Sequence, residues 1–262
     1  PVRTMRRAGD ILIPKPEGRG WWFLTAYNPL RMNDLPCQFF TVDLDSKQYT
    51  VQNLFPSGFP VQTYANQPLP GRDGKYFIGH TVAQPDREIG LWEFNPADAA
   101  LRWHGFPEVK RRLGPHTMAQ APDGMIYLGM ASNQNLLIEF DPRTGAFRNF
   151  GFAGPEHPFP RYVWGLAAAD DYVYAVGGKN PWYLIAADRK TMKQTILLQG
   201  RIDYLEAQGM GDGCTASVTW LNEDGSKAGK HYRLRGGQAI EYDPAAEPAP
   251  AAPPAPPPPR PE

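Results

Sequence analysis

Side chains able to bind or transform an anionic sugar occur at comparable points along the sequence, next to short aromatic segments. Arginine and lysine bind carboxylates, and an aromatic ring offers a flat apolar surface on which a sugar ring can stack. A histidine or tyrosine beside such a cation can act as the base of a β-elimination. The candidate bases are His116, His80 and Tyr204. The candidate ligand-binding residues are Arg161, Trp164, Lys179, Asn180, Tyr27, Arg31, Gln62 and Glu206.

Several of these residues also have a purely structural interpretation. His116 stands at the start of an expected strand, where its ring can bond a neighbouring carbonyl. His80 ends an expected strand and can be an exposed loop residue. Arg161 and Trp164 can form a cation–π pair away from any ligand. His104, on an expected outer strand, is interpreted as a surface residue.

Short strands in a repeating unit must position these side chains. The clearest unit begins at Pro115 and divides into expected strands at 116–121, 125–130, 136–140 and 146–150. Asp123-Gly124 separates the first two strands, because glycine adopts positive φ at no steric cost. The run 141–145, DPRTG, closes the last hairpin as a tight turn. The unit therefore reads as an antiparallel meander of four strands.

The same pattern recurs along the chain. LWEFNPADAALRWHGF from Leu91 matches LIEFDPRTGAFRNFGF from Leu137, and segments from Phe39 and Tyr183 have the same form. The turn residues are spaced by 50, 46 and 47 residues. A period of about 40–50 residues with four strands each is typical of a β-propeller blade. The turn residues compared are Asp45, Asn95, Asp141 and Asp188.

The sequence thus predicts an all-β protein, a β-propeller of about five four-stranded antiparallel blades, or an incomplete six- or seven-bladed ring. The expected propeller domain covers 1–243, with blades at about 8–58, 59–114, 115–160, 161–201 and 202–243. Residues 244–262 consist mostly of alanine and proline and are expected to form a disordered linker or tail, because prolines cannot donate to a sheet.

The expected fold brings the candidate residues together. In a propeller the first strand of each blade lines the central channel. The loop that enters this strand and the loop between the second and third strands lie on one face. Every candidate residue falls on one of these loops or at the start of a first strand. We therefore expect them to converge at the channel mouth.

Composition narrows the classes of function. The chain has 27 Lys and Arg against 27 Asp and Glu, which argues against a general nucleic-acid binder. No apolar run is long enough to predict a membrane span. The chain begins at Pro1, as a trimmed precursor would, so a secreted or periplasmic location is slightly favoured. The glycine-rich segment GMGDG at 209–213 is interpreted as a turn and not as a phosphate-binding loop, because no Lys-Ser/Thr pair closes it.

The unit from Pro115 resembles a blade of the virginiamycin B lyase-like and SMP-30/NHL-like propellers. The resemblance lies in Pro115-His116, the APDG turn at 121–124, Ile126-Tyr127, the NLL segment at 135–137 and the DPRTG turn at 141–145. It covers one repeat well and three loosely. It implies propeller architecture, and it implies a lyase, a lactonase-type hydrolase or a binding module. The His-x-Glu arrangement of the lyase family is not found here, so no catalytic residue carries over.

Three hypotheses follow. The first is a propeller that binds a small molecule, an oligosaccharide or a protein at its loop face. The second is a carbohydrate-active lyase or a lactonase-type hydrolase, for which a divalent cation is an open alternative. The third is an inactive fragment of a longer propeller protein. No cofactor is certain from the sequence, and no metal ligand can be assigned.

Overall fold

The computed structural model describes residues 11–15, 21–27, 38–53, 69–71, 73–80, 88–110, 115–132, 136–154, 161–178 and 181–246. Almost all of the regular structure in these ranges is β-strand. The helices there are two short 3₁₀ turns, η1 (Gly211–Gly213) and η2 (Pro244–Ala246). No helix in the described ranges has the length and apolar character needed to cross a bilayer. The alanine- and proline-rich run at 247–262 lies outside them.

The strands form five consecutive antiparallel meanders of four strands. The first contains β1 (Ile11–Pro14), β2 (Trp21–Tyr27), β3 (Gln38–Asp43) and β4 (Tyr49–Asn53). The second contains β5 (Leu69–Pro70), β6 (Tyr76–His80), β7 (Glu88–Asn95) and β8 (Ala100–Lys110). The third contains β9 (Pro115–Gln120), β10 (Ile126–Ser132), β11 (Leu136–Asp141) and β12 (Ala146–Phe152).

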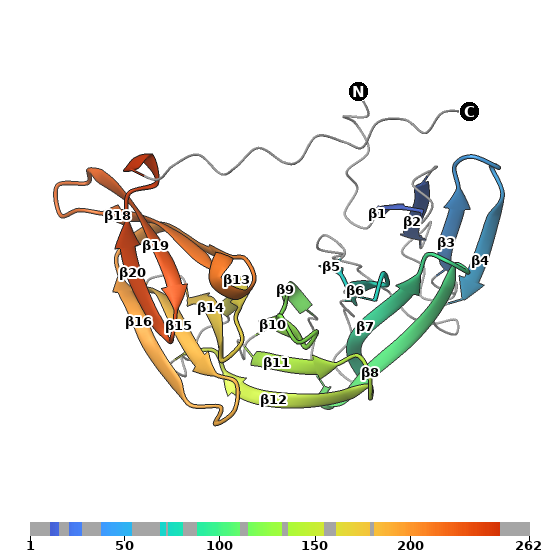
Figure 1. Cartoon of the computed structure of the whole chain (residues 1–262), viewed down its shortest axis with the longest axis horizontal. Coiled ribbons are helices and arrows are strands. Elements are labelled where there is room, and N and C mark those ends of the chain that lie inside the picture. Colours follow the sequence, from blue (N-terminus) through green and yellow to red (C-terminus); the bar gives the residue numbers. More distant parts are fainter. Residues whose placement is uncertain are drawn as a thin grey trace, which may run out of the picture.

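The last two meanders complete the fold. The fourth contains β13 (Arg161–Ala168), β14 (Tyr172–Gly178), β15 (Trp182–Asp188) and β16 (Gln194–Gly200). The fifth contains β17 (Ile202–Gln208), β18 (Thr215–Leu221), β19 (Lys227–Arg235) and β20 (Gln238–Tyr242). The meanders succeed one another along an arc, with β9 and β13 on its inner side and β8, β12 and β16 on its outer side (Figure 1). This is the predicted propeller architecture, in which each first strand faces the axis.

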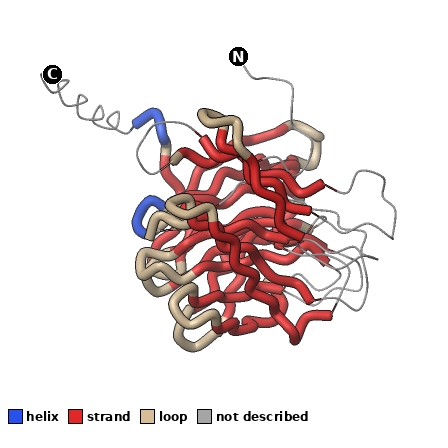
Figure 2. Tube along the Cα trace, turned by 90° about the vertical axis from the view of Figure 1, so that its right-hand side faces the viewer, coloured by secondary structure: helices blue, strands red, loops and turns tan. Residues whose placement is uncertain are grey.

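Two ends of the blades can be distinguished. At the entry end, first strands begin and second strands finish; here the end of β10 pairs with the start of β13, Ser132 opposite Arg161. At the opposite, turn end lie the hairpin turns that join first to second and third to fourth strands. Figure 2 shows several of these turns in tan, side by side along one edge. The strand ends that an entry loop and a second-to-third loop connect therefore lie on one face, as predicted.

The turns between the third and fourth strands of the first four meanders share one local hydrogen-bonding arrangement. The side-chain oxygen of the last strand residue accepts a backbone N–H two residues later, at Asn95, Asp141 and Asp188. In the first meander this residue is Asp43, whose Oδ1 accepts the N–H of Asp45 at 3.0 Å. The prediction that Asp45 is the equivalent turn residue was therefore wrong by two positions. Short polar side chains favour such turns because they mimic a backbone turn.

The core consists of apolar layers between neighbouring sheets. Between the third and fourth sheets, Tyr127, Leu137, Val163 and Ile185 are essentially buried. Between the fourth and fifth sheets the layer includes Tyr174 and the buried Cys214 thiol, which is free. Burial raises the pKa of this thiol to about 11. A single four-stranded sheet cannot cover both of its faces, so stacking around an axis supplies the cover.

His104 is a correction to the sequence-based prediction, which placed it on the surface. Only 6% of its surface is exposed. Its Nε2 lies 2.7 Å from Oε2 of Glu93, and its ring packs edge-on against Phe140 of the next sheet, with centroids 4.8 Å apart. Lys75 Nζ lies 2.6 Å from Oε1 of the same carboxylate. The histidine is buried because the third sheet covers the outer strand on which it lies.

This buried carboxylate predicts a dependence of stability on pH. Burial opposes ionisation of Glu93, but hydrogen bonds from Lys75 and His104 outweigh it and hold the Glu93 pKa below its ordinary value of 4.5. The stabilisation is therefore complete above pH 4.5 and is lost as the pH falls through the lower folded pKa. Glu93→Gln should lower the free energy of unfolding by about 1–3 kcal/mol at pH 7 and by less in acid.

Urea unfolding at neutral and acid pH measures this difference. Glu241→Gln is the control, because its exposed carboxylate forms a surface ion pair with Lys230. Such a pair contributes about 0–1 kcal/mol. If Glu93→Gln and the parent differed by the same amount at both pH values, the carboxylate would not be the origin of the dependence.

Candidate functional site

Three successive first strands carry a β-bulge near the entry end. In β9, Thr117 and Pro115 pair with the consecutive residues Gly129 and Met130 of β10, so His116 between them is the extra residue. In β13 the register leaves out Trp164, between Val163 and Gly165. A bulge turns one side chain out of the regular alternation and is common at the rims of barrels and beside binding sites.

The bulge of β17 occupies the corresponding place. Ile202 pairs with Trp220 and Tyr204 with Thr219, so Asp203 is the extra residue. The first strands β9, β13 and β17 are neighbours, and each bulge lies near the start of its strand, so the three bulged residues form a series at the entry end. We call this series, with the side chains that contact it, the bulge row. Its members are His116, Tyr162, Trp164, Trp182, Asp203 and Lys227.

Aromatic rings surround Trp164. Its ring centroid lies 5.2 Å from that of His116, 4.9 Å from that of Tyr162 and 5.9 Å from that of Trp182. The Nε1–H donates a hydrogen bond of 3.0 Å to the carbonyl of Gly178 at the end of β14. With 38% of its surface exposed, Trp164 offers an anchored and accessible indole surface. This arrangement suits stacking with a flat, weakly polar ligand.

The imidazole of His116 is held neutral. Burial lowers its pKa below the ordinary value of 6.5, and a hydrogen bond with the Val163 backbone only partly opposes this. Its Nδ1 is buried and has no hydrogen-bond partner among the residues that the structure describes. The structural interpretation of His116, a bond to a neighbouring carbonyl, is thus realised in part. The acceptor nitrogen of this neutral ring is therefore enclosed, and a ligand reaches it only by displacing a neighbouring side chain.

Charged and phenolic groups continue the row on β17. Asp203 Oδ2 lies 2.8 Å from Lys227 Nζ, and both side chains are substantially exposed. Tyr204, the predicted base on this strand, donates its hydroxyl proton to Glu206 Oε2 at 2.5 Å. This hydrogen bond, together with burial, raises the Tyr204 pKa above its ordinary value. In this arrangement Tyr204 is a hydrogen-bond donor to Glu206, and Asp203 beside it is paired with Lys227.

The other predicted site residues are placed by backbone or lie outside the described ranges. Tyr27 ends β2, His80 ends β6 and Arg161 begins β13, so all three stand at the entry end, while their side chains are not described. The remaining four lie outside the described part of the chain: Arg31, Gln62, Lys179 and Asn180.

Sequence reasoning missed Tyr162, Trp182, Asp203 and Lys227. Trp182 and Lys227 each begin a third strand and contact the bulged residue of the same sheet. Comparing the first residue of each third strand across repeats could have found them. The bulges themselves depend on strand register, which the repeat pattern alone does not determine.

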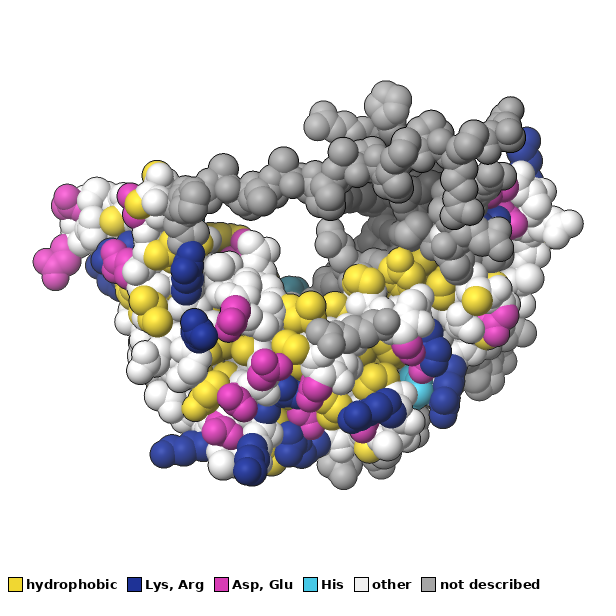
Figure 3. All heavy atoms as spheres, viewed as in Figure 1, with side chains coloured by type: hydrophobic (Ala, Val, Ile, Leu, Met, Phe, Trp, Pro, Cys, Tyr) yellow, Lys and Arg dark blue, Asp and Glu magenta, His cyan; other side chains and the backbone are white. Residues whose placement is uncertain are grey.

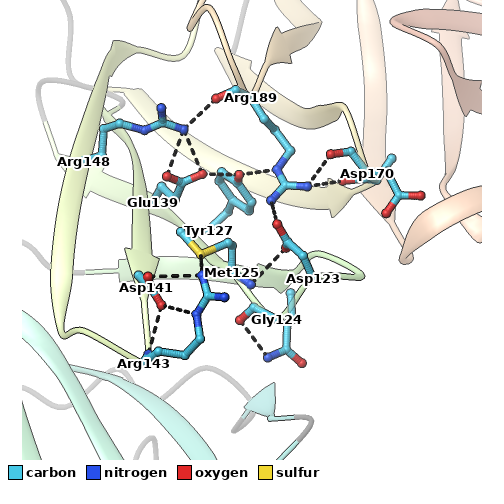
Figure 4. Close-up of polar contacts among 12 residues, drawn as sticks. Asp123, Gly124, Met125, Tyr127, Glu139, Asp141, Arg143, Arg148, Asp170 and Arg189 are labelled. Atoms are coloured by element: carbon cyan, nitrogen blue, oxygen red, sulfur yellow. Dashed lines mark hydrogen bonds and ion pairs between the residues drawn. The ribbon is translucent and has the colours of Figure 1, made fainter.

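A second polar cluster lies at the turn end, between the third and fourth sheets (Figure 4). The Arg189 guanidinium donates to the Tyr127 hydroxyl and to Asp123 Oδ2, both at 2.5 Å. The Tyr127 hydroxyl donates in turn to Glu139, which also accepts Arg148 Nη2 at 2.9 Å. The sequence pattern placed Asp123 in a turn and assigned the other residues of this cluster no functional role. Among the described residues, no three His, Cys, Asp or Glu side chains are grouped to hold a metal ion, here or in the bulge row.

The chain matches no family model and no curated protein. Among solved structures it is similar to a puromycin hydrolase, with 17% identity and a TM-score of 0.53 over 89% of this chain and 38% of the other. An oligogalacturonate lyase in complex with manganese gives 9% identity and 0.50, over 90% and 66%. Dipeptidyl peptidase 4 of Porphyromonas gingivalis gives 10% identity and 0.50, over 92% and 40%.

At these identities the likeness shows the fold alone. The chain spans between 38% and 66% of the lengths of these structures. The predicted propeller architecture is supported, whereas no family match supports the virginiamycin B lyase-like or SMP-30/NHL-like resemblance more specifically.

Proposed function

We propose that the entry end of the propeller binds a ligand through the bulge row, and that this ligand is an oligosaccharide. The observation that carries the proposal is the exposed indole of Trp164, anchored by its bond to Gly178 and flanked by His116 and Trp182. Sugar rings present apolar C–H faces and a rim of hydroxyl groups. An indole surface supplies the apolar contact, and Asp203 and Lys227 supply polar partners one blade further along.

Titration of the protein with neutral and uronate oligosaccharides tests the proposal. We expect Trp164→Ala to weaken binding by about tenfold or more, as truncation of an aromatic anchor usually does. Trp164→Phe should retain much of the affinity, because the stacking surface survives. Tyr49→Ala is the control, since Tyr49 is 67% exposed on an outer strand away from the row. Equal affinity of Trp164→Ala and the parent would exclude this surface.

A second candidate function, a lyase acting on a uronate polymer, is favoured by one observation. The His116 imidazole is neutral at pH 7 and has an unpartnered ring nitrogen among the described residues. Such a group can take the proton next to a uronate carboxyl where a bound substrate reaches Nδ1, which is buried in the structure. Incubation with uronate polymers, with and without divalent cations, should then give an unsaturated product that absorbs in the ultraviolet, and His116→Gln should abolish it.

The two experiments separate the hypotheses. Binding without product supports a binding propeller, and product that depends on His116 supports the lyase. The third hypothesis, an inactive fragment of a longer propeller protein, predicts neither saturable binding nor product. Folding is checked independently by cooperative unfolding of the same preparation.

A further inference from the structure

A pocket of about 520 Å³ lies at the turn end, in the groove between the third and fourth sheets. Figure 3 views the molecule from this end and shows basic and acidic side chains gathered over these sheets. The pocket is on the opposite end of the blades from the bulge row, so it is independent of the function proposed above. Its lining residues are Asp123, Met125, Glu139, Asp141, Arg143, Ala146, Phe147, Arg148, Asp170, Arg189 and Lys190.

Most carboxylates of the pocket are already occupied. Asp123 accepts from Arg189 Nη2 and from the backbone N–H of Met125. Glu139 accepts from Tyr127 and Arg148. Asp141 accepts from the side chain and backbone of Arg143. These three acidic groups therefore have little capacity left to bind a cation.

Arg189 is equally occupied, and it is only 9% exposed. Its Nε donates to Tyr127, Nη2 to Asp123, and Nη1 to the carbonyls of Ala169 and Asp170. All three guanidinium nitrogens have partners, so this arginine builds the wall of the pocket and is not available to a ligand.

Three other cations retain open donors (Figure 4 labels two of them). Arg148 contacts Glu139 and the Arg189 carbonyl through Nη2 alone, and 41% of its side chain is exposed. Its Nη1 therefore has no partner among these contacts. Arg143 uses Nε and Nη2, and its side chain is 72% exposed. Lys190 has an exposed side chain and no ion pair among the described residues. Of the four acidic residues that line the pocket, Asp170 is the one whose carboxylate has no ion pair with the described residues.

Apart from the Asp170 carboxylate, the groups of the pocket with open hydrogen-bonding capacity are therefore cationic, while Met125, Ala146 and Phe147 add apolar or weakly polar surface. Guanidinium forks and an ammonium group recognise oxyanions through charge-assisted hydrogen bonds. We propose that this pocket is a second binding site, for a small ligand that carries a carboxylate or phosphate group on a compact body of about sugar size. Arg143, Arg148 and Lys190 bind the oxyanion, and the apolar side contacts the body of the ligand.

Calorimetric titration with inorganic phosphate, D-glucuronate and D-glucose tests the site. We expect saturable binding of one or both anions and none of glucose, because the neutral sugar lacks the oxyanion. Preference for phosphate or for glucuronate identifies the source of the oxyanion. No saturable binding of either anion, or equal binding of glucose, would overturn the proposal.

Substitutions assign the binding to this pocket. Arg143→Gln and Lys190→Gln combined should weaken anion binding by at least about tenfold, since each removes a charge-assisted hydrogen bond. Lys193 is exposed on the same hairpin turn as Lys190 and does not line the pocket, so Lys193→Gln should change affinity less than twofold. Arg148 is left intact because it bonds the buried Glu139. Equal weakening by Lys193→Gln would indicate non-specific attraction and reject the site.

Discussion

Arg189→Met should lower the free energy of unfolding by about 3–5 kcal/mol, the usual cost of removing one partner from a buried charged cluster. Arg189 belongs to the hairpin turn after β15 in the fourth sheet, and it contacts Tyr127 in the third sheet, 62 residues earlier. Methionine has similar length and can fill the space. The substitution therefore removes the hydrogen bonds without creating a large cavity.

The groups left behind explain the size of the effect. The carbonyl of Ala169 loses its donor at 3.0 Å, and Asp123 loses its cation. Tyr127 is fully buried, and its hydroxyl keeps only the carboxylate of Glu139. Burial and this carboxylate both raise the Tyr127 pKa above its ordinary value, so the phenol stays protonated and continues to need its partners. Buried polar groups without partners cost about 1–3 kcal/mol each.

Urea unfolding measures the loss, and Lys193→Met on the same hairpin is the control, expected to stay within about 0.5 kcal/mol of the parent. Tyr127→Phe removes the hydroxyl but keeps the ring. In a double-mutant cycle, the combined variant should lose less than the sum of the two single losses, because both remove the same hydrogen bond. Additive losses would show that the arginine does not stabilise the contact between sheets through Tyr127.

The same contact between sheets recurs one blade further along. Tyr174 occupies the corresponding strand of the fourth sheet, and its hydroxyl accepts the backbone N–H of Gly237 at 3.0 Å, from the last hairpin turn of the fifth sheet. In the second sheet the corresponding ring is Phe77, which packs edge-on against Phe140 with centroids 6.0 Å apart. An aromatic residue on the second strand thus meets the next blade each time, with a partner that varies.

The sequence predicted the fold because blade formation is local. Strand-length aromatic segments, and turns such as Asp141 to Gly145, recur at near-constant intervals, and each hairpin forms from neighbouring residues. Contacts between blades are not local. The pairing of Arg189 with Tyr127 and the burial of His104 against Phe140 join different repeats, and no periodicity within one repeat predicts them.

The candidate site was predicted in part for the same reason. His116 and Trp164 were selected because they stand near the starts of first strands, and they do lie in ring contact. Asp203 was missed because its role follows from a register shift, which depends on how β17 pairs with β18. The charged pocket at the turn end was missed because Asp and Arg in a tight turn are also explained by turn formation alone.

Gly209→Ala is expected to cost about 3 kcal/mol, because positive-φ strain of about 1–2 kcal/mol adds to overpacking of about 1–3 kcal/mol. Gly209 has a φ of +112°, and an added Cβ would lie 2.2 Å from the Gly213 carbonyl oxygen. The GMGDG segment is therefore a compact turn, as the sequence predicted, and η1 occupies its second half. Gly209 also accepts the N–H of Ala168 at 3.2 Å, which ties the turn to the fourth sheet.

Gly213 in the same turn provides a matched control. An added Cβ there meets no atom within 4 Å, and its φ is not in the left-handed region. Gly213→Ala should therefore stay within about 0.5 kcal/mol of the parent in urea unfolding. A loose, solvated loop would tolerate both substitutions equally, whereas a rigid turn packed on the fourth sheet tolerates only the second. The bridge between Met210 and Ala168 holds this turn against β13. The near-ultraviolet signal, which reports aromatic packing, should therefore be weaker in folded Gly209→Ala than in the parent.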